Sequence, residues 1–290
     1  MTDRLPNVAL LGLGTMGAAM AQTARRGGMP LVAWNRTPPG TDALSELGIE
    51  VVPTVADAVA GADVIITMVT NGDAVRAIAV EEGLLEALRP GAVWAQMSTI
   101  GAEATEQASA LVRDRRPDAL FVDAPVSGSK IPAEKGTLLI FASGPEEAQP
   151  LVQPVFDTLG QRTMWLGPAG NGSRMKLVNN VLLAFTAEGV ANALALAHRS
   201  GLDTSTVIGA FDGGPLISAW ESAKFRRIAE GDYSAEFALA LALKDVHLAL
   251  ADGGPSRFKV LAALASEWDE LVDRGFGDED VTVVTKALSG

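Results

Sequence analysis

The sequence predicts two domains: an α/β domain built on a parallel sheet, followed by an all-helical domain. Up to residue 166, short apolar runs alternate with helical segments, the pattern of a parallel sheet covered by helices. After residue 201 only helical segments follow. The chain has 290 residues, of which 48% are hydrophobic, so it is long enough to bury two cores. We predict a first domain over residues 1–168 and a second over residues 169–290.

The first predicted strand leads directly into a glycine-rich turn. Residues 7–11 read NVALL, and GLGTMG and the helical segment AAMAQTARRG follow them. The glycines have the spacing G-x-G-x-x-G, which permits a tight turn, lets backbone N–H groups approach a pyrophosphate and allows close packing of helix on strand. The order strand, turn, helix predicts a Rossmann dinucleotide-binding domain, with cofactor contacts from Gly12, Gly14, Thr15, Met16 and Gly17.

The second predicted strand, residues 31–35, ends where such a domain places the residue that meets the adenosine ribose, about 20 residues past the glycines. The chain has no carboxylate there and reads Asn35, Arg36, Thr37. A carboxylate favours the free 2′-hydroxyl of NAD, whereas arginine and hydroxyl donors suit a 2′-phosphate. We therefore predict that these three residues bind NADP(H) in preference to NAD(H). The alternative is a solvated loop.

The alternation continues through four further apolar runs, at residues 50–52, 62–69, 92–97 and 119–124. Ligands of a parallel α/β sheet bind beyond the carboxyl ends of its strands. The turns that follow two of these runs are therefore expected to line the cofactor site, with contacts from Met68, Val69, Thr70 and Thr99. Thr70 and Asn71 are equally suited to a turn that has no further role.

A turn rich in small and hydroxyl-bearing residues follows the sixth predicted strand. Residues 123–144 read DAPVSGSKIPAEKGTLLIFASG, in which Ser127, Gly128 and Ser129 offer backbone N–H groups and two hydroxyls. Such a turn is a natural receptor for a carboxylate, although Ser-Gly-Ser alone is also an ordinary loop. Two more strands, at residues 137–143 and 163–166, are predicted to close the first domain.

Residues 170–201 are predicted to form one long helix that joins the domains. Between Lys176 and His198 the only charged residue is Glu188, and apolar residues occupy every side of the helical wheel. The helix is expected to be buried all round and, at about 40 Å, to pack against two domains or a second subunit. A membrane span is the alternative, but the apolar run is interrupted by Asn179, Asn180, Glu188 and Asn192.

Two polar groups suggest a site within these helical segments. Lys176, Asn179 and Asn180 are spaced i, i+3 and i+4, so they share one face near the start of the long helix. Lys244 and Asp245 interrupt the apolar run FALALALKDVHLAL. Because a buried charge is costly unless paired, they are expected to face the cleft, with a solvated helix face as the alternative. The second domain is predicted to contain helices over residues 203–211, 217–230, 237–251 and 259–274, with a short one from residue 281.

The composition limits which binding partners and which cellular compartment are expected. The chain has 23 basic and 35 acidic residues, a net charge of −12, which argues against nucleic acid because its binding depends on neutralising phosphates with Lys and Arg. There is no cysteine and there are only two histidines, so we expect no metal site. The N-terminal MTDRLPN lacks the charged and apolar regions of a signal peptide, and we expect a cytoplasmic protein that binds no membrane.

Four motifs, taken in order, resemble the β-hydroxyacid dehydrogenase family, the group that includes 3-hydroxyisobutyrate dehydrogenase. They are GLGTMG near the start, DAPVSGS in the middle, GNGSRMKLVNN on the long helix and KDVHLAL in the helical domain. The resemblance covers essentially the whole chain. The SGSK-x-PAE-x-G arrangement of residues 127–136 is most similar to the glyoxylate and succinic semialdehyde reductase branch, whereas residues 240–243 are more apolar than the corresponding segment of that branch.

The resemblance implies a Rossmann domain and a helical domain joined by the long helix, with homodimers or homotetramers formed largely through the helical parts. It implies reduction of a small carboxylate-bearing aldehyde, such as glyoxylate or succinic semialdehyde, to the hydroxyacid. By motif position, Lys176 matches the family's catalytic lysine and Asn180 the neighbouring asparagine that helps to orient the substrate. Lys244 matches a lysine near the cofactor. The candidate substrate contacts are Ser127, Gly128, Ser129, Asn179 and Asp245.

Aldehyde reduction requires a proton donor within hydrogen-bond reach of the oxygen on which negative charge develops, and Lys176 is the candidate. An imine reductase shares the architecture but usually carries aspartate or tyrosine where this chain has Lys176. Three further alternatives are a 3-hydroxyisobutyrate-type dehydrogenase, a 6-phosphogluconate-type decarboxylating dehydrogenase and a non-enzymatic scaffold. The helical domain is too short for a 6-phosphogluconate-type enzyme. Relatives that serve as scaffolds lose the lysine that this chain has at position 176.

Overall fold

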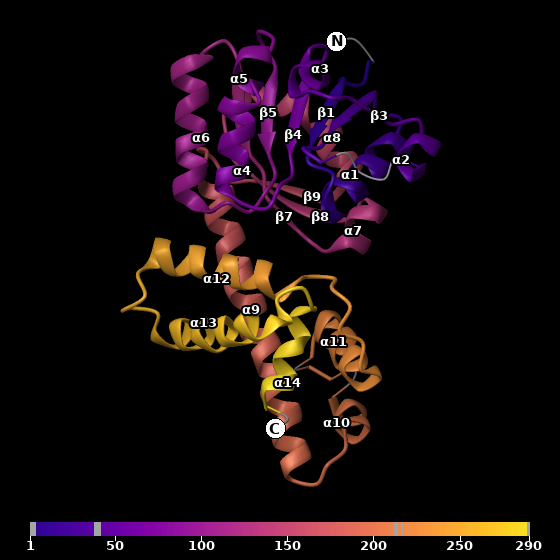
Figure 1. Cartoon of the computed structure of the whole chain (residues 1–290), viewed down its shortest axis with the longest axis vertical. Coiled ribbons are helices and arrows are strands. Elements are labelled where there is room, and N and C mark those ends of the chain that lie inside the picture. Colours follow the sequence, from indigo (N-terminus) through magenta and orange to yellow (C-terminus); the bar gives the residue numbers. More distant parts are fainter. Residues whose placement is uncertain (1–3, 38–41, 212–213, 216, 289–290) are drawn as a thin grey trace. The chain divides into compact units, whose positions relative to one another are not determined.

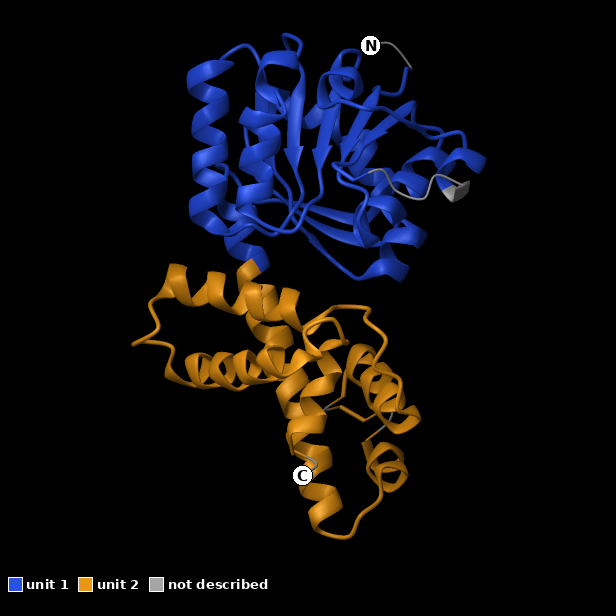
Figure 2. Ribbon diagram, in the orientation of Figure 1, with its two compact units in different colours: residues 1–176 blue, residues 177–290 orange. Residues whose placement is uncertain are grey.

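The computed structural model describes residues 4–37, 42–211, 214–215 and 217–288. Its contacts divide the chain into two compact units, residues 1–176 and 177–290, which are coloured separately in Figure 2. Unit 1 is an α/β domain with a parallel sheet and unit 2 is helical, which confirms the predicted fold class. The border between the units lies inside the long helix α9 (Asn171–Arg199), whereas the sequence places the domain border at residue 168.

Unit 1 is built around a six-stranded parallel sheet with the order β3-β2-β1-β4-β5-β6 (Figure 1). Strand β1 pairs with β2 on one side, where Val8 is opposite Leu31, and with β4 on the other, where Val8 is opposite Val64. The strand order therefore reverses between β1 and β4, the point at which ligands of such sheets bind. The strands are β1 (Val8–Leu11), β2 (Leu31–Trp34), β3 (Glu50–Val51), β4 (Val64–Thr67), β5 (Val93–Gln96) and β6 (Leu120–Asp123).

Helices cover both faces of this sheet, and the alternation of side chains along β1 shows how. Val8 and Leu10 belong to the core cluster on one face, and Ala9 and Leu11 belong to the cluster on the other. Because both faces are buried, the strands read as continuous apolar runs. The helical elements of unit 1 before α9 are α1 (Thr15–Arg26), α2 (Asp42–Glu46), α3 (Val55–Val59), α4 (Gly72–Arg76), η1 (Ala77–Glu81), α5 (Leu84–Ala87), α6 (Gly101–Arg115), α7 (Lys130–Lys135), η2 (Glu146–Ala148) and α8 (Gln149–Leu159).

A second, three-stranded sheet completes unit 1. Its order is β7-β8-β9, with β7 (Val126–Ser127) antiparallel to β8 (Leu138–Ala142) and β8 parallel to β9 (Gly160–Trp165). The two longer strands are those predicted from the sequence. Strand β7 was not predicted from the sequence, because a strand of two residues leaves no periodic pattern to detect.

Helix α9 has nearly the predicted extent, but the prediction that it is buried all round is wrong. Ala184, Ala187 and Ala191 pack into the main core of unit 2, whereas Leu182 and Leu196 are 70% and 67% exposed. The helices of unit 2 cover only part of the circumference of α9. An apolar wheel predicts burial, but it cannot distinguish contacts within the chain from a face left for another contact.

By length and composition alone, α9 is able to cross a membrane, since its most apolar window has a mean hydropathy of 1.4. This is weak evidence, because core helices of soluble proteins pass the same test. Within that window, 33% of the residues are buried in the protein. Glu188 on the same helix accepts hydrogen bonds from Trp268 Nε1 at 2.5 Å and Asn192 Nδ2 at 3.0 Å, and burial raises the pKa of its carboxyl. The helix therefore carries polar contacts as well as core packing.

Unit 2 consists of the greater part of α9 and the helices that follow it. Its main core gathers around Trp268, and a smaller cluster gathers around Phe225. The segments agree with the helices predicted for the second domain. They are α10 (Thr204–Phe211), α11 (Ala219–Glu230), α12 (Leu239–Gly253), α13 (Lys259–Leu271), η3 (Val272–Phe276), η4 (Val281–Val283) and α14 (Val284–Leu288).

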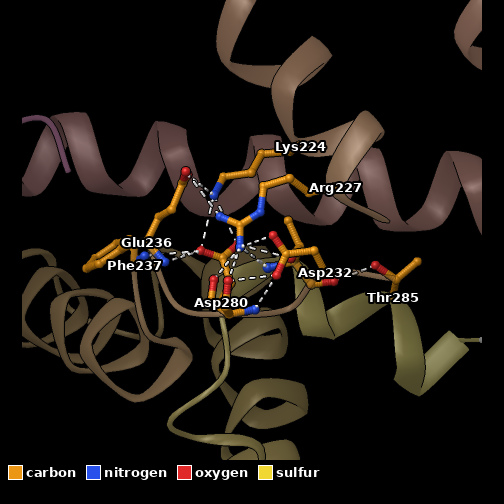
Figure 3. A network of polar contacts seen from close by, with 9 residues as sticks. Lys224, Arg227, Asp232, Glu236, Phe237, Asp280 and Thr285 are labelled. Carbon is orange, nitrogen blue, oxygen red and sulfur yellow. Dashed lines mark hydrogen bonds and ion pairs between the residues drawn. The ribbon is translucent and has the colours of Figure 1, made fainter. Parts of the chain in front are cut away.

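A buried ion cluster ties the C-terminal segment to α11 (Figure 3). Lys224 Nζ lies 3.0 Å from Asp280 Oδ1 and 3.0 Å from Glu236 Oε2. Asp280 also accepts hydrogen bonds from the backbone N–H groups of Glu236 and Phe237, at 3.0 and 3.1 Å. Burial alone would raise the pKa of the Asp280 carboxyl, but the Lys224 ammonium and the N–H donors outweigh it and hold that pKa below its usual value.

Replacement of Asp280 by asparagine is expected to lower the free energy of unfolding by about 3 kcal/mol at neutral pH, because it leaves the Lys224 charge buried without its main partner. A carboxylate with a depressed pKa stabilises the fold above its unfolded-state pKa, and this stability is lost as the pH falls through the folded-state pKa. Urea unfolding of both proteins at pH 7 and in acid measures the difference.

The matched control is Asp232→Asn, which removes a more exposed carboxylate from the same cluster and is expected to cost less than Asp280→Asn, because water screens its charge. A difference between wild type and Asp280→Asn that stays constant into strong acid would contradict this account of the cluster.

Candidate active site

The glycine-rich turn after β1 is shaped by contacts within unit 1. Gly12 has φ +107°, a conformation that favours glycine, and an added Cβ would collide with the carbonyl oxygen of Met68. A Cβ on Gly17 would collide with the carbonyl oxygen of Gly12. At Gly14, by contrast, an added Cβ would meet no atom within 4 Å. The first and third glycines are therefore required by packing, whereas the open side of the second is where a ligand can approach the backbone.

The N-terminus of α1 follows this turn and favours an anion. The helix has 12 residues, no acidic residue in its first turn, and Gly14 before it, which cannot cap it through a side chain. The N–H groups at Thr15 and Met16 are thus available to a ligand oxygen, and the helix dipole adds positive potential. These features fit the pyrophosphate of a dinucleotide. The residues predicted to contact the cofactor, Gly12, Gly14, Thr15, Met16 and Gly17, all lie in this turn or at the start of α1.

The side chain of Asn35 links the glycine-rich turn to the end of β2 through hydrogen bonds. Its Oδ1 accepts a hydrogen bond from the N–H of Leu13 at 2.8 Å, and its Nδ2 donates to the carbonyl oxygen of Thr37 at 2.6 Å. Both polar atoms of this side chain therefore bind the protein itself. The structure gives Asn35 a positioning role, while Arg36 and Thr37 remain exposed at the same strand end.

A pocket of about 460 Å³ opens beside Arg36 and continues to the turn after β4. Thr70 and Asn71 line it, and the pocket lies at the carboxyl edge of the sheet, where the adenosine part of a dinucleotide binds in such folds. Asn71 also caps α4, because its Oδ1 accepts a hydrogen bond from the N–H of Ala74 at 2.9 Å. Its role in the turn therefore does not exclude a place on the pocket wall.

Buried polar side chains connect the turns after β4 and β5, which the sequence predicts to line the cofactor site. Ser98 Oγ accepts a hydrogen bond from the N–H of Val69 at 2.8 Å, and the N–H of Ser98 donates to Gln96 Oε1 at 2.7 Å. Met68 is held from the other side, because its N–H donates to the carbonyl oxygen of Leu11. These bonds fix Met68 and Val69 beside Gly12, and Thr99 follows directly on Ser98.

Strand β6 ends on a buried carboxylate that was not among the predicted site residues. Asp123 Oδ2 accepts hydrogen bonds from the N–H groups of Gly170 at 3.1 Å and Ser173 at 2.8 Å, and from Ser143 Oγ at 3.0 Å. Its Oδ1 accepts from Ser173 Oγ at 2.8 Å. Burial raises the pKa of the Asp123 carboxyl, and these four donors oppose that rise. A carboxylate that ends an apolar strand was the signal available in the sequence.

The first turn of α9 is thereby docked on the end of β6. Ser143 Oγ also accepts a hydrogen bond from the N–H of Gly172 at 2.9 Å, and Ser173 Oγ lies 2.8 Å from Thr105 Oγ1 of α6. A Cβ on Gly172 would collide with the carbonyl oxygen of Phe141, so glycine is needed for this close approach. The start of α9 is therefore held in one position by both sheets of unit 1 and by α6.

The predicted carboxylate receptor and the predicted catalytic lysine both belong to unit 1. Ser127 ends β7, Gly128 follows with φ +133°, and Ser129 precedes α7. Lys176 lies in the second turn of α9 and is only 8% exposed. Both segments therefore depend on Asp123. The turn at Ser127 follows Asp123 by four residues in the chain, and the start of the helix that carries Lys176 is hydrogen-bonded to Asp123.

The remaining predicted residues lie in unit 2, where they form one hydrogen-bonded group. Asn180 Nδ2 donates to Asp245 Oδ2 at 2.5 Å, Asn179 Nδ2 donates to Asn180 Oδ1 at 2.9 Å, and Lys244 Nζ donates to Asp245 Oδ1 at 2.6 Å. Asp245 is buried, so it does not belong to a solvated helix face. Its charge is paired with Lys244, and its second oxygen orients Asn180, one helical turn after Lys176.

Comparisons with known proteins match the whole chain. A family model described as the NAD binding domain of 6-phosphogluconate dehydrogenase matches residues 7–167, and one described as NAD-binding of NADP-dependent 3-hydroxyisobutyrate dehydrogenase matches residues 170–288. Glyoxylate/succinic semialdehyde reductase 1 of Arabidopsis thaliana is 33% identical over 284 residues, which cover 97% of this chain and 98% of that protein.

Two further relatives bear other names. The NAD-dependent L-serine dehydrogenase of Pseudomonas aeruginosa is 31% identical over 292 residues, which cover 97% of each chain. A solved structure of 3-hydroxyisobutyrate dehydrogenase from Mycobacterium tuberculosis with L-serine has a TM-score of 0.85 at 26% identity, and covers 99% of this chain and 100% of that one. The names of these relatives give different cofactors and substrates.

Asp123→Ala is expected to loosen the start of α9, because the N–H groups of Gly170 and Ser173 lose their acceptor. We expect a loss of about 3 kcal/mol in the free energy of unfolding. We also expect faster amide hydrogen exchange over residues 170–176, measured by mass spectrometry.

Asp123→Asn is the matched control, since an amide oxygen can still accept from both N–H groups while the amide nitrogen donates to Ser173 Oγ. It should retain most of the protection of residues 170–176. Equal protection in wild type and Asp123→Ala would show that the helix start is held by other contacts.

Proposed function

The chain belongs to the β-hydroxyacid dehydrogenase family and is an NAD(P)-dependent oxidoreductase, and from this we propose that it uses NADPH to reduce a small carboxylate-bearing aldehyde to the hydroxyacid. Glyoxylate and succinic semialdehyde represent the substrate class. The observation that carries this proposal lies in unit 1, where a lysine and a turn with two hydroxyls are both tied to the buried end of β6.

Lys176 is the proton donor in this proposal. NADPH, when bound, supplies the hydride to the carbonyl carbon. As negative charge develops on the carbonyl oxygen, the Lys176 ammonium stabilises it and then transfers a proton to it. A donor of this kind must keep its place to be effective, and the docking of α9 on Asp123 restricts its movement.

The carboxylate of the substrate is held by the turn after β7. Ser127 and Ser129 offer hydroxyls, and the backbone at Gly128 has the left-handed conformation that exposes an N–H group in such turns. With the carboxylate fixed there, the carbonyl carbon is oriented for reduction, and such positioning supplies a large part of the rate enhancement. Within unit 2, Asp245 orients the side chain of Asn180, which stays a predicted substrate contact.

The preference for NADPH is supported by the end of β2. Arg36 and Thr37 are exposed there, and Arg36 lines the pocket on the adenosine side of the sheet. No carboxylate of β2 is present to accept a hydrogen bond from a free 2′-hydroxyl. The glyoxylate and succinic semialdehyde class is supported by the motif of residues 127–136 and by the Arabidopsis relative's name.

Lys176→Ala is expected to lower turnover by about 10²- to 10⁴-fold while the affinity for NADPH stays nearly unchanged. Absorbance of the reduced nicotinamide reports turnover with glyoxylate, succinic semialdehyde and methylmalonate semialdehyde, each with NADPH and with NADH. Fluorescence of bound NADPH reports affinity. One of the first two aldehydes with NADPH should be the preferred pair.

Lys176→Arg separates charge from proton transfer, since arginine keeps the charge but does not release a proton at neutral pH. It should remain slow, whereas Lys135→Ala on α7 should behave as wild type. Retained turnover in Lys176→Ala would overturn the role of this lysine. Preference for methylmalonate semialdehyde would favour a 3-hydroxyisobutyrate-type dehydrogenase, and reduction of cyclic imines alone would favour an imine reductase.

We also propose that the chain forms a homodimer or homotetramer through the exposed face of α9. Leu182, Phe185 and Leu196 recur along this face, and Gly189 lies at its middle. The one charged residue between them in the sequence, Glu188, accepts a hydrogen bond from Trp268 of α13. A second copy fits this surface better than a charged partner does. Two copies of the helix can cross closely at the glycine, and a two-fold contact presents the same apolar residues from each side.

Light scattering after size-exclusion chromatography is expected to give at least twice the mass of one chain. Leu196→Glu should lower that mass, because it buries a charge at the contact. Val260→Glu, at an equally exposed apolar position on a different helix, α13, should leave it unchanged. A monomeric wild type would contradict the proposal.

A further inference from the structure

The pocket beside Arg36 is lined by a second arginine, which was not among the predicted site residues. Arg76 is the last residue of α4, and it lines the same pocket of about 460 Å³ as Arg36 and Thr70. We propose that Arg76 is a second specificity-determining residue for the phosphorylated adenosine end of NADPH, and that Glu81 restrains it. This inference rests on the NADPH preference of the proposed function.

The position of Arg76 is fixed by the local backbone. Helix α4 starts from the end of β4 and is capped by Asn71, so its direction is set by the sheet. After Arg76 the chain makes one π-helical turn, η1, over Ala77–Glu81. Turns of this kind are rare and are often found at functional sites. Here the π-turn lies on the wall of the pocket, since Ala77 and Glu81 both line it.

The π-turn brings Glu81 to Arg76. On a regular α-helix the residues that face each other are three or four apart, and residues five apart point in different directions. A π-turn closes between residues five apart. Arg76 Nη1 accordingly lies 3.2 Å from Glu81 Oε1. The guanidinium is thus held at the pocket by a carboxylate that the unusual turn has placed there.

This ion pair is weak enough to exchange for a ligand. The side chains of Arg76 and Glu81 are 62% and 66% exposed, and ion pairs of such exposure contribute little. A phosphate dianion offers a guanidinium more charge and more acceptor oxygens than a carboxylate does. Arg76 can therefore turn from Glu81 to a 2′-phosphate at small cost, whereas a 2′-hydroxyl offers no comparable exchange.

The pocket is also lined by carboxylates, and these allow the opposite cofactor preference, for NADH, to be tested. Asp73 and Glu81 line the same wall. If either accepted a hydrogen bond from a free ribose hydroxyl, the pocket would select NADH instead. In the arrangement proposed here Glu81 repels the 2′-phosphate and competes for Arg76, so its neutralisation improves the binding of NADPH.

Fluorescence titration of the full chain with NADPH and with NADH tests the inference through binding alone. Arg76→Ala is expected to weaken NADPH binding by roughly fivefold and to leave NADH unchanged. Glu81→Gln is expected to tighten NADPH binding by roughly twofold. Added salt should reduce both effects, because the charges are exposed. The matched control is Arg113→Ala, which breaks an equally exposed arginine–carboxylate pair, with Asp114 at 3.2 Å on α6, and should change neither affinity.

The results separate this inference from the proposed function. If wild type prefers NADPH and Arg36→Ala abolishes the preference, but Arg76→Ala binds NADPH as wild type does, Arg76 has no such role and the NADPH proposal stands. If wild type has no preference for NADPH, both fail. Weaker NADH binding in Glu81→Gln would overturn the assigned role of Glu81, because it would make this carboxylate a ribose ligand.

Discussion

The buried carboxylate of Asp123 is the constraint on which the rest of the candidate site depends. Strand β6 ends on it. Gly170, just before α9, donates an N–H group to it, and Ser173 in the first turn of α9 donates an N–H group and a hydroxyl. A helix start docked on a desolvated charge has little freedom, because any shift would leave that charge without donors. Ser127 follows Asp123 by four residues, and Lys176 lies one turn beyond the docked residues. The positions of both are therefore set from one strand end.

Charges in this chain occupy two kinds of setting, which suit different tasks. Asp123, Asp245 and Asp280 are buried, and each is held by several donors, so moving any of them is costly. Arg36 and Arg76 are exposed, and the ion pair of Arg76 with Glu81 can be exchanged at small cost. The proposed function uses both: the proposed proton donor Lys176 is supported by a charge of the first kind, and the proposed contacts to the cofactor's 2′-phosphate are of the second kind.

Much of this arrangement was predictable from the sequence, and the failures have physical reasons. The six strands of the parallel sheet and the turn at Gly12 follow from local patterns, namely apolar runs and glycine spacing. Strand β7 is too short to show a period, and Asp123 gains its partners from segments 20 and 50 residues away in the chain. The exposed face of α9 was missed because an apolar wheel reports composition, not which sides the remaining helices cover.

Cofactor choice and fold are separable in such a structure. Gly12 and Gly17 are required by backbone contacts inside unit 1 whichever nucleotide binds, and the open side of Gly14 admits either one. We propose that discrimination between a phosphate and a hydroxyl falls to exposed side chains at the ends of β2 and α4, where substitutions leave the core intact. A relative whose name specifies NAD and a relative whose name gives no cofactor can therefore have the same parallel sheet. The cofactor must be inferred from the charges around the pocket, because the glycine motif is common to both.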